Sequence, residues 1–168
     1  ECGTLHGKAV KAIILCGAAR AFVAGADVTE FNNNSAPVIA KIAKDNLNIF
    51  NDIESLKIPV ISLIDGFALG GGNELAMCTH YRIATENAVI GQPEVKLGLI
   101  PGHAGTQRLA RLVGVGKAKE LIFTGDLIDA HEAMRIGLVN KVVAPDKIIE
   151  EAKNIAHKIS EVCPFAVR

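Results

Sequence analysis

Residues 59–78 read Pro-Val-Ile-Ser-Leu-Ile-Asp-Gly-Phe-Ala-Leu-Gly-Gly-Gly-Asn-Glu-Leu-Ala-Met-Cys, and this stretch decides the fold. Residues 60–64 form a nearly unbroken apolar run, which is typical of a strand covered on both faces. The three glycines at 70–72 let the backbone take unusual angles and let a ligand approach it closely. We therefore expect a buried strand, a glycine turn and a helix that carries Leu75, Ala76 and Met77 inward.

Glu74 falls in the first turn of this expected helix. First-turn amides have no partner inside the helix, and the helix field there favours an ionised carboxylate. Such a place can bind a developing oxyanion beside a base. The same residues are equally typical of a tight glycine turn in which Glu74 is an ordinary capping residue, so this stretch alone leaves both interpretations open.

The whole chain predicts one globular domain spanning residues 1–168. Its formal net charge of +0 gives no basic surface for nucleic acid or an anionic membrane, and no apolar run is long enough to span a membrane. Cys16 and Cys78 lie among apolar residues, which predicts buried thiols and a reducing compartment. We expect a cytoplasmic protein, or a mitochondrial-matrix protein if the source is eukaryotic.

The rest of the chain alternates between strand-like and helix-like patterns. Residues 8–17 are predicted to form a central strand, and the apolar spacing over 38–56 predicts a long amphipathic helix that leads to the strand at 60–64. Strand, helix and strand in this order imply a parallel pair. The remaining predictions are strands at 81–84, 88–91 and 138–143, an irregular segment around Glu94, and helices at 115–123, 129–136 and 146–160.

Several common functional motifs are missing from the sequence. The glycines do not form a dinucleotide fingerprint or a phosphate loop, and no G-x-S-x-G elbow is present. The five histidines are scattered and predict no metal site, and His80 is interpreted as structural.

Four separated segments together resemble the enoyl-CoA hydratase (crotonase) family. They are Ala21-Phe-Val-Ala-Gly-Ala-Asp27, Gly66-Phe-Ala-Leu-Gly-Gly-Gly-Asn-Glu74, Gly91-Gln-Pro-Glu94 and Pro101-Gly-His-Ala-Gly-Thr-Gln-Arg-Leu109. The resemblance implies an α/β fold, a crotonase-like spiral of ββα units. It also implies acyl-CoA thioester substrates, no metal or redox cofactor, and homotrimers that often pair into hexamers. Members of the family have a strand before Glu1 and further helices after Arg168, so we expect only the core of such a protein.

The resemblance also implies roles for particular residues. Glu74 and Glu94 correspond to the two acid/base carboxylates, and the backbone amides of Ala26 and Gly71 correspond to the oxyanion hole. The further contacts expected for the substrate and its coenzyme A portion are Ala24, Asp27, Val28 and Gly102.

Two carboxylates around one water can activate that water and move a proton at the carbon next to the thioester. Both carboxylates are present here, which favours reversible hydration of trans-2-enoyl-CoA to 3-hydroxyacyl-CoA in fatty-acid metabolism. The alternatives are another crotonase-type reaction, namely isomerisation, hydrolysis or decarboxylation of an acyl-CoA, and a non-catalytic relative that binds coenzyme A or RNA or serves as an assembly subunit.

Four residues depart from the family pattern. Thr29 stands where a lysine near the coenzyme is usual, Asn73 replaces a commoner cysteine, and His80 replaces a commoner aspartate. His103 stands where a small residue is usual, close to the expected water site. We expect His103 to alter the shape of the pocket or its response to pH.

Overall fold

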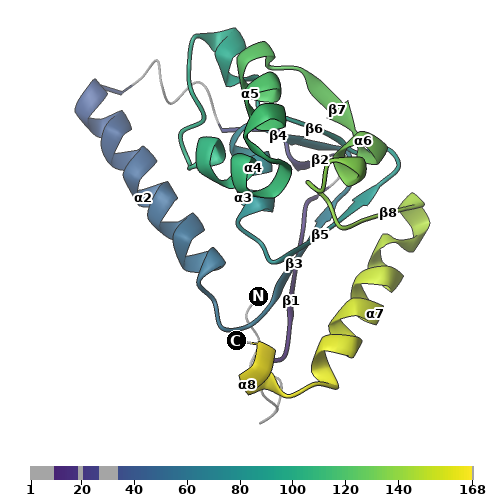
Figure 1. Cartoon of the computed structure of the whole chain (residues 1–168). Coiled ribbons are helices and arrows are strands. Elements are labelled where there is room, and N and C mark those ends of the chain that lie inside the picture. Colours follow the sequence, from purple (N-terminus) through teal and green to yellow (C-terminus); the bar gives the residue numbers. More distant parts are fainter. Residues whose placement is uncertain (1–9, 19–20, 27–33, 168) are drawn as a thin grey trace.

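The computed structural model describes residues 10–18, 21–26 and 34–167. The described chain begins with three ββα units, and the remaining helices and strands follow them in a different order (Figure 1). In chain order they are β1 (Ile13–Cys16), β2 (Ala21–Val23), α2 (Ala36–Glu54), β3 (Val60–Ile64), β4 (Phe67–Leu69), α3 (Gly71–Met77), β5 (Tyr81–Thr85), β6 (Val89–Gly91), η1 (Pro93–Leu97), α4 (Gly105–Val113), α5 (Val115–Thr124), β7 (Leu127–Asp129), α6 (Ala130–Arg135), β8 (Lys141–Val143), η2 (Pro145–Lys147), α7 (Ile148–Ser160) and α8 (Pro164–Val167).

The strands form two sheets, and each ββα unit contributes one strand to each sheet. One sheet has the order β1-β3-β5-β8 with every pair parallel. The other has the order β2-β4-β6-β7, and only its last pair is antiparallel. The α/β class and the spiral of ββα units are therefore confirmed.

The strand β3 is buried at all five positions, as its apolar run predicts. It lies between β1 and β5, and its apolar side chains are divided between two apolar clusters. Ile61 and Leu63 pack with Ile148 of α7, whereas Ile64 joins the larger cluster that contains residues of α3, α4, α5 and α6. Covering both faces of one strand explains why its sequence does not alternate.

Two predictions about the segment that forms β1 are wrong. It was expected to be central, but within the described part of the chain it forms one end of its sheet. Cys16 was expected to be buried, yet it is exposed and its thiol is free. Both predictions came from the apolar run around Ile13, and such a run does not reveal how many neighbours a strand has.

Three strands were not predicted, namely β2, β4 and β7, and each has only three residues. A segment this short carries no readable period, so its pairing depends on the neighbouring strands. The segment around Glu94, expected to be irregular, is the short helix η1 with Pro93 in its first turn. Pro93 fits there because the first residues of a helix need no internal amide donor.

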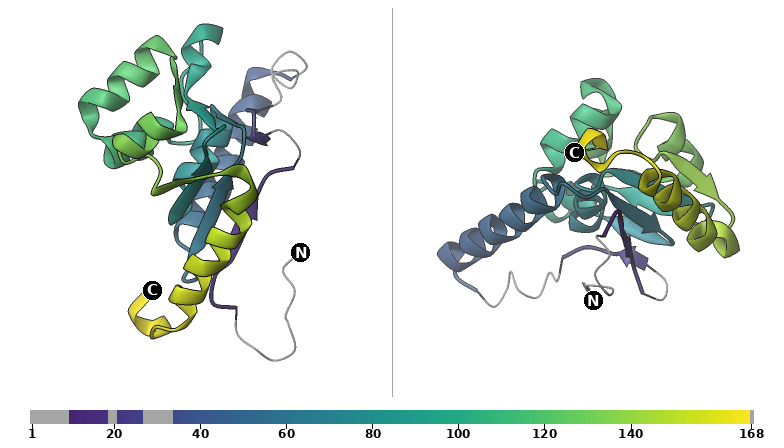
Figure 2. Two further views of the ribbon diagram at one scale, coloured as in Figure 1. Left: turned by 90° about the vertical axis from the view of Figure 1, so that its right-hand side faces the viewer. Right: turned by 90° about the horizontal axis from the view of Figure 1, so that it is seen from below.

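The long helix α2 stands apart from the body of the molecule (Figures 1 and 2) and has no fully buried residue. Its last turn is tied to the sheet by His80, whose Nδ1 accepts the Val60 amide at 3.0 Å and whose Nε2 lies 3.1 Å from the Glu54 carbonyl. The structural interpretation of His80 is therefore confirmed.

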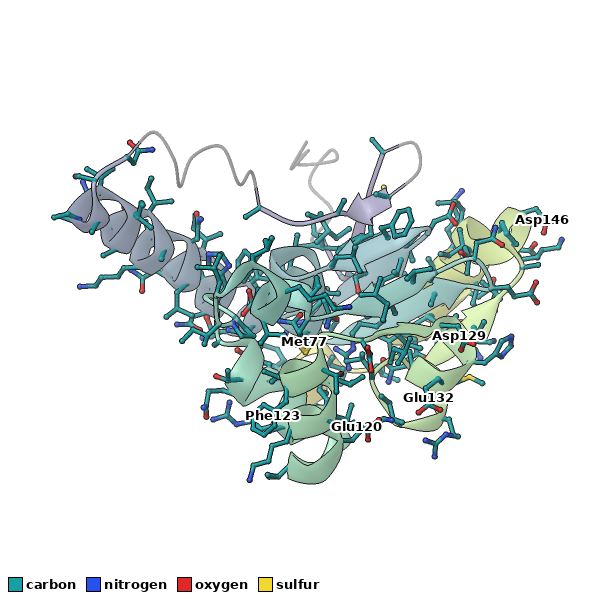
Figure 3. The ribbon with its side chains drawn as sticks, turned by 90° about the horizontal axis from the view of Figure 1, so that it is seen from above. Met77, Glu120, Phe123, Asp129, Glu132 and Asp146 are labelled. Atoms are coloured by element: carbon teal, nitrogen blue, oxygen red, sulfur yellow. The ribbon has the colours of Figure 1, made fainter. Side chains whose placement is uncertain are left out.

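The helices α4, α5 and α6 contribute buried residues to the larger apolar cluster. Figure 3 shows Glu120 and Phe123 on the outer side of α5, away from the sheets, while Met77 of α3 lies in the interior. Asp129 caps the start of α6 by accepting the Glu132 amide at 2.7 Å, near the start of the helix predicted at 129–136. No helix of the described residues is long and apolar enough to cross a membrane.

Gly72 allows α3 to pack directly on β2. A Cβ atom at this position would collide with the carbonyl group of Val23. We expect Gly72→Ala to lower the free energy of unfolding by about 1–3 kcal/mol or more, because backbone must move to admit the methyl group. The measurement is the urea midpoint at constant m-value.

Gly116 provides the matched control for this substitution. It lies in α5, and a Cβ atom there would meet nothing within 4 Å. Gly116→Ala should be neutral or stabilising by up to about 1 kcal/mol, because alanine favours a helix over glycine. Equal effects of the two substitutions would contradict the packing argument.

Candidate active site

A cavity of about 270 Å³ lies between α2 and the segments that follow β2, β4 and β6. Its wall is mostly apolar, with Ile39 and Ile42 on the α2 side and Leu97, Leu99 and Ile100 on the other. Apart from Asn46 of α2, the polar groups lie in one part of the wall, where Glu74, Glu94 and His103 meet the backbone of residues 24–26 and 70–71. An apolar cavity with a few convergent polar groups is typical of a ligand site.

Glu74 reaches this cavity from the first turn of α3 and is only 1% exposed. Its Oε1 accepts two backbone amides, from His103 at 2.8 Å and from Gly105 at 2.6 Å. Its Oε2 lies 3.2 Å from the Nδ1 atom of His103. Both oxygens of a buried carboxylate are thus held by groups from one loop, which fixes the orientation of the side chain.

Gly105 is required by the close approach of this loop to Glu74. A Cβ atom on Gly105 would lie 2.7 Å from Glu74 Oε1 and 2.6 Å from the Nε2 atom of Gln92. Any larger residue would therefore displace the carboxylate or the amide. The same geometry shows that Gln92 and Glu74 are immediate neighbours.

Glu94 lies in the first turn of η1 on the same side of the cavity. Its Oε1 accepts a hydrogen bond from Gln92 Nε2 at 3.2 Å, and Gln92 is itself held by Asn73 at 2.9 Å. Gln92 therefore connects the surroundings of the two carboxylates, which converge on one cavity. The Oε2 atom of Glu94 is buried and has no hydrogen-bond partner among the described residues.

The environment of Glu94 favours its neutral form. Burial raises the pKa of the Glu94 carboxyl above its ordinary value, and the negative charge of Glu74 raises this pKa further. A backbone hydrogen bond and the charge of His103 act on the pKa in the opposite direction. A raised carboxyl pKa in a cavity is characteristic of groups that exchange protons with a ligand.

The backbones of Gly71 and Ala26 line the same part of the cavity. Gly71 is the first residue of α3, and Ala26 follows β2. A Cβ atom on Gly71 would lie 3.9 Å from the Ala26 nitrogen and 3.6 Å from His103 Nδ1, which places the three residues side by side. Neither amide donates a hydrogen bond to any of the described residues.

The structure brings most of the predicted site residues together. Glu74, Glu94, Ala24, Ala26, Gly71 and Gly102 all line the cavity. Asp27 and Val28, which were expected to contact the substrate, and Thr29, which departs from the family pattern, lie outside the described residues.

Three residues of the site were not singled out from the sequence, namely Gln92, Gly105 and Arg108. All three lie within the family motifs, which was the only signal available for them. Arg108 is buried and donates to the His103 carbonyl at 2.7 Å, to Asn51 at 2.7 Å and to Glu54 at 2.8 and 2.9 Å. It thereby connects the loop that holds Glu74 to the end of α2.

The fold and this site together are those of a crotonase-like α/β protein. The family model described as enoyl-CoA hydratase/isomerase matches residues 5–168, and the chain belongs to this family. The chain is 51% identical over 161 residues to a crotonyl-CoA hydratase of Syntrophomonas wolfei, covering 95% of this chain and 62% of that protein. It is 52% identical to a short-chain-enoyl-CoA hydratase of Clostridium acetobutylicum, covering 95% of this chain and 61% of that protein.

Solved structures show the same likeness. An enoyl-CoA hydratase structure from Bacillus anthracis superposes with a TM-score of 0.90 at 45% identity, covering 94% of this chain and 61% of that one. The chain thus spans about six tenths of the length of the relatives it matches.

The raised pKa of Glu94 predicts an effect on stability. Because the native state holds the Glu94 proton more tightly than the unfolded chain does, this residue makes the free energy of unfolding fall as the pH rises above the ordinary value of 4.5. We expect Glu94→Gln to be more stable than the parent protein at neutral pH, with a difference that shrinks towards about pH 4. Urea unfolding at both pH values measures this.

Glu86→Gln is the control, since Glu86 is an exposed glutamate whose side chain makes no hydrogen bond or ion pair with the described residues. A stability difference for Glu94→Gln that is the same at both pH values would contradict the burial argument.

Proposed function

We propose that this chain forms the core of an enoyl-CoA hydratase, which reversibly adds water to trans-2-enoyl-CoA to give 3-hydroxyacyl-CoA. The observation that carries the proposal is the convergence of Glu74 and Glu94 on one cavity beside the unpaired amides of Ala26 and Gly71. The names of the relatives, a crotonyl-CoA hydratase and a short-chain-enoyl-CoA hydratase, support the same reaction and a short acyl chain.

The chemical step needs a place for negative charge. Addition of water to the double bond puts charge on the thioester oxygen as an enolate forms. Amides of Ala26 and Gly71 donating to this oxygen would stabilise it, and loss of one such donor typically costs about 10²–10³ in rate. Fixed backbone donors are suited to this because they need no rearrangement during the reaction.

The two carboxylates would divide the proton transfers. Glu74, fixed by the loop amides, orients and activates the water that attacks the β-carbon, with the Gly102 amide helping to hold this water. Glu94 transfers the proton at the α-carbon, and its raised pKa supports this role because it favours the protonated carboxyl that delivers this proton. Groups this close titrate as a pair, so their protonation states depend on each other.

The proposed reaction needs only the protein, water and the acyl-CoA substrate. We propose that Ala24, Asp27 and Val28 contact the coenzyme A portion and that no metal or redox cofactor takes part. The reaction belongs to β-oxidation or a related fatty-acid pathway in the cytoplasm, or in the mitochondrial matrix of a eukaryote.

A second candidate is isomerisation of the acyl-CoA double bond. The family description includes isomerases, and isomerisation requires the same enolate stabilisation. The products distinguish the two reactions, because hydration adds the mass of one water and isomerisation adds nothing.

The activity test follows loss of the conjugated-thioester absorbance of crotonyl-CoA with the protein in its natural full length, together with product mass. Glu74→Gln and Glu94→Gln should each lower kcat by about 10²–10⁴, because each removes an acid/base group while preserving shape. Glu86→Gln, remote from the cavity, should retain the parent rate. No gain of water, or full activity in both glutamine variants, would refute the hydratase proposal.

We further propose a homotrimer, or a dimer of trimers, for the protein in its natural full length, on the basis of the family resemblance. Light scattering coupled to size-exclusion chromatography should give a mass of three or six subunits. A monomer at all concentrations tested would refute this part of the proposal.

A further inference from the structure

Among the described residues that line the cavity, His103 is the one ionisable residue for which the proposed hydratase chemistry has no role. It departs from the family pattern, and its side chain is only 14% exposed. Its Nδ1 atom lies 3.2 Å from Glu74 Oε2 and close to the backbone of Gly71. A titratable ring therefore sits between the base and the amides of the proposed oxyanion hole.

The imidazole is held in this position from several directions. Its ring packs against Phe50 of α2 with centroids 5.1 Å apart, and its own carbonyl accepts Arg108 Nη1 at 2.7 Å. The next residue, Ala104, has a φ of 65°, the only positive φ among the described non-glycine residues. An alanine in this region costs about 1 kcal/mol or more, so the surrounding contacts must maintain the loop conformation.

The hydrogen bonds to Glu74 leave its Oε2 atom as the acceptor available to the His103 ring. Oε1 already accepts the amides of His103 and Gly105, whereas His103 Nδ1 is the one protein donor found for Oε2 in the described structure. A hydrogen on Nδ1 would complete the set of donors to the carboxylate. It would fix the plane of the carboxylate and so orient its oxygens towards a water molecule.

We propose that His103 is a positioning residue for Glu74 in the hydration reaction: its Nδ1–H donates to Glu74 Oε2 and makes turnover depend on the protonation of the imidazole. The proposal rests on the hydratase function proposed above. The proton remains within the pair in this arrangement, and the substrate receives none from His103.

The direction of the pH effect follows from the charges around the ring. Glu74 of α3 and Glu94 of η1 face it from the cavity, while Arg108 of α4 contacts its carbonyl and is paired with Glu54 of α2. Cys78, which follows α3 and whose pKa the charge of Arg108 lowers, stays neutral because burial raises the pKa of its thiol to about 11.

A proton on His103 would therefore act mainly on the two glutamates. It would weaken Glu74 as a base, and its positive charge favours the ionised form of Glu94, which must carry a proton during hydration. Hydration should therefore be slower when the imidazole carries a second proton.

The experiment compares two substitutions of His103 in the protein in its natural full length. His103→Ala removes the donor and should lower kcat for crotonyl-CoA by about 10- to 100-fold, with KM changed much less. His103→Asn places an amide nitrogen near the position of Nδ1 and should restore most of the rate. Because an asparagine side chain does not take up a proton, the decrease in hydration rate at low pH, called here the acidic limb of the pH profile, should occur at lower pH in this variant than in the parent protein.

His131→Asn is the matched control, since His131 is exposed on α6 and does not line the cavity. It should retain the parent rate and pH profile. Parent kinetics in His103→Ala with an unchanged acidic limb would overturn the proposal, and so would failure of His103→Asn to change the limb.

A measurement without turnover separates this inference from the hydratase proposal and covers variants that fail to fold. In ¹⁵N-labelled protein, the His103 imidazole should show a protonated Nδ1 and an unprotonated Nε2 at neutral pH, and Glu74→Gln should shift the Nδ1 signal. The Nε2–H tautomer, or no response to Glu74→Gln, would overturn the inference. If no enoyl-CoA is hydrated by the parent protein, the hydratase proposal fails and this spectrum alone decides whether the pair exists.

Discussion

The site depends on one interaction, the capture of the Glu74 carboxylate by the backbone amides of His103 and Gly105. A carboxylate that is 1% exposed would cost several kcal/mol if it lost its hydration without replacement. Backbone amides provide that replacement at fixed positions and do not titrate. The same two bonds dock the loop after η1 onto α3, so the position of the acid and the shape of the cavity are set together.

Glycines make this docking possible. Gly105 leaves room for Glu74 and Gln92, and Gly72 lets α3 lie against the carbonyl of Val23. Without the second contact α3 would move away from β2, and the Gly71 amide would lose its position beside Ala26. The glycine-rich motifs of the sequence are therefore explained by close backbone packing as much as by the conformational freedom of the residue.

The spiral of ββα units explains how residues distant in the chain meet. Each unit sends one strand to each sheet, so the segments after β2, β4 and β6 leave the second sheet side by side. Ala26, Gly71 and Glu94 follow these three strands, and Arg108 then ties the loop after η1 to the end of α2. The polar side of the cavity is built from equivalent points of successive units, while α2 supplies an apolar wall.

The sequence alone determined the elements with strong local signals. The buried strand at 60–64 and the long helix α2 follow from apolar patterns, and the joint match of four motifs identified the family and the candidate residues Glu74, Glu94, Ala26 and Gly71. Only the tertiary structure decided that β1 lies at an end of its sheet with Cys16 exposed and that three very short strands complete the second sheet. It also decided that Gln92 and Gly105 adjoin the carboxylates, and that His103, expected near the water site, contacts Glu74 directly. The physical reason is the separation along the sequence. Periodicity and turn chemistry depend on residues close together in the chain, whereas strand neighbours and the partners of a buried charge depend on contacts between residues tens of positions apart.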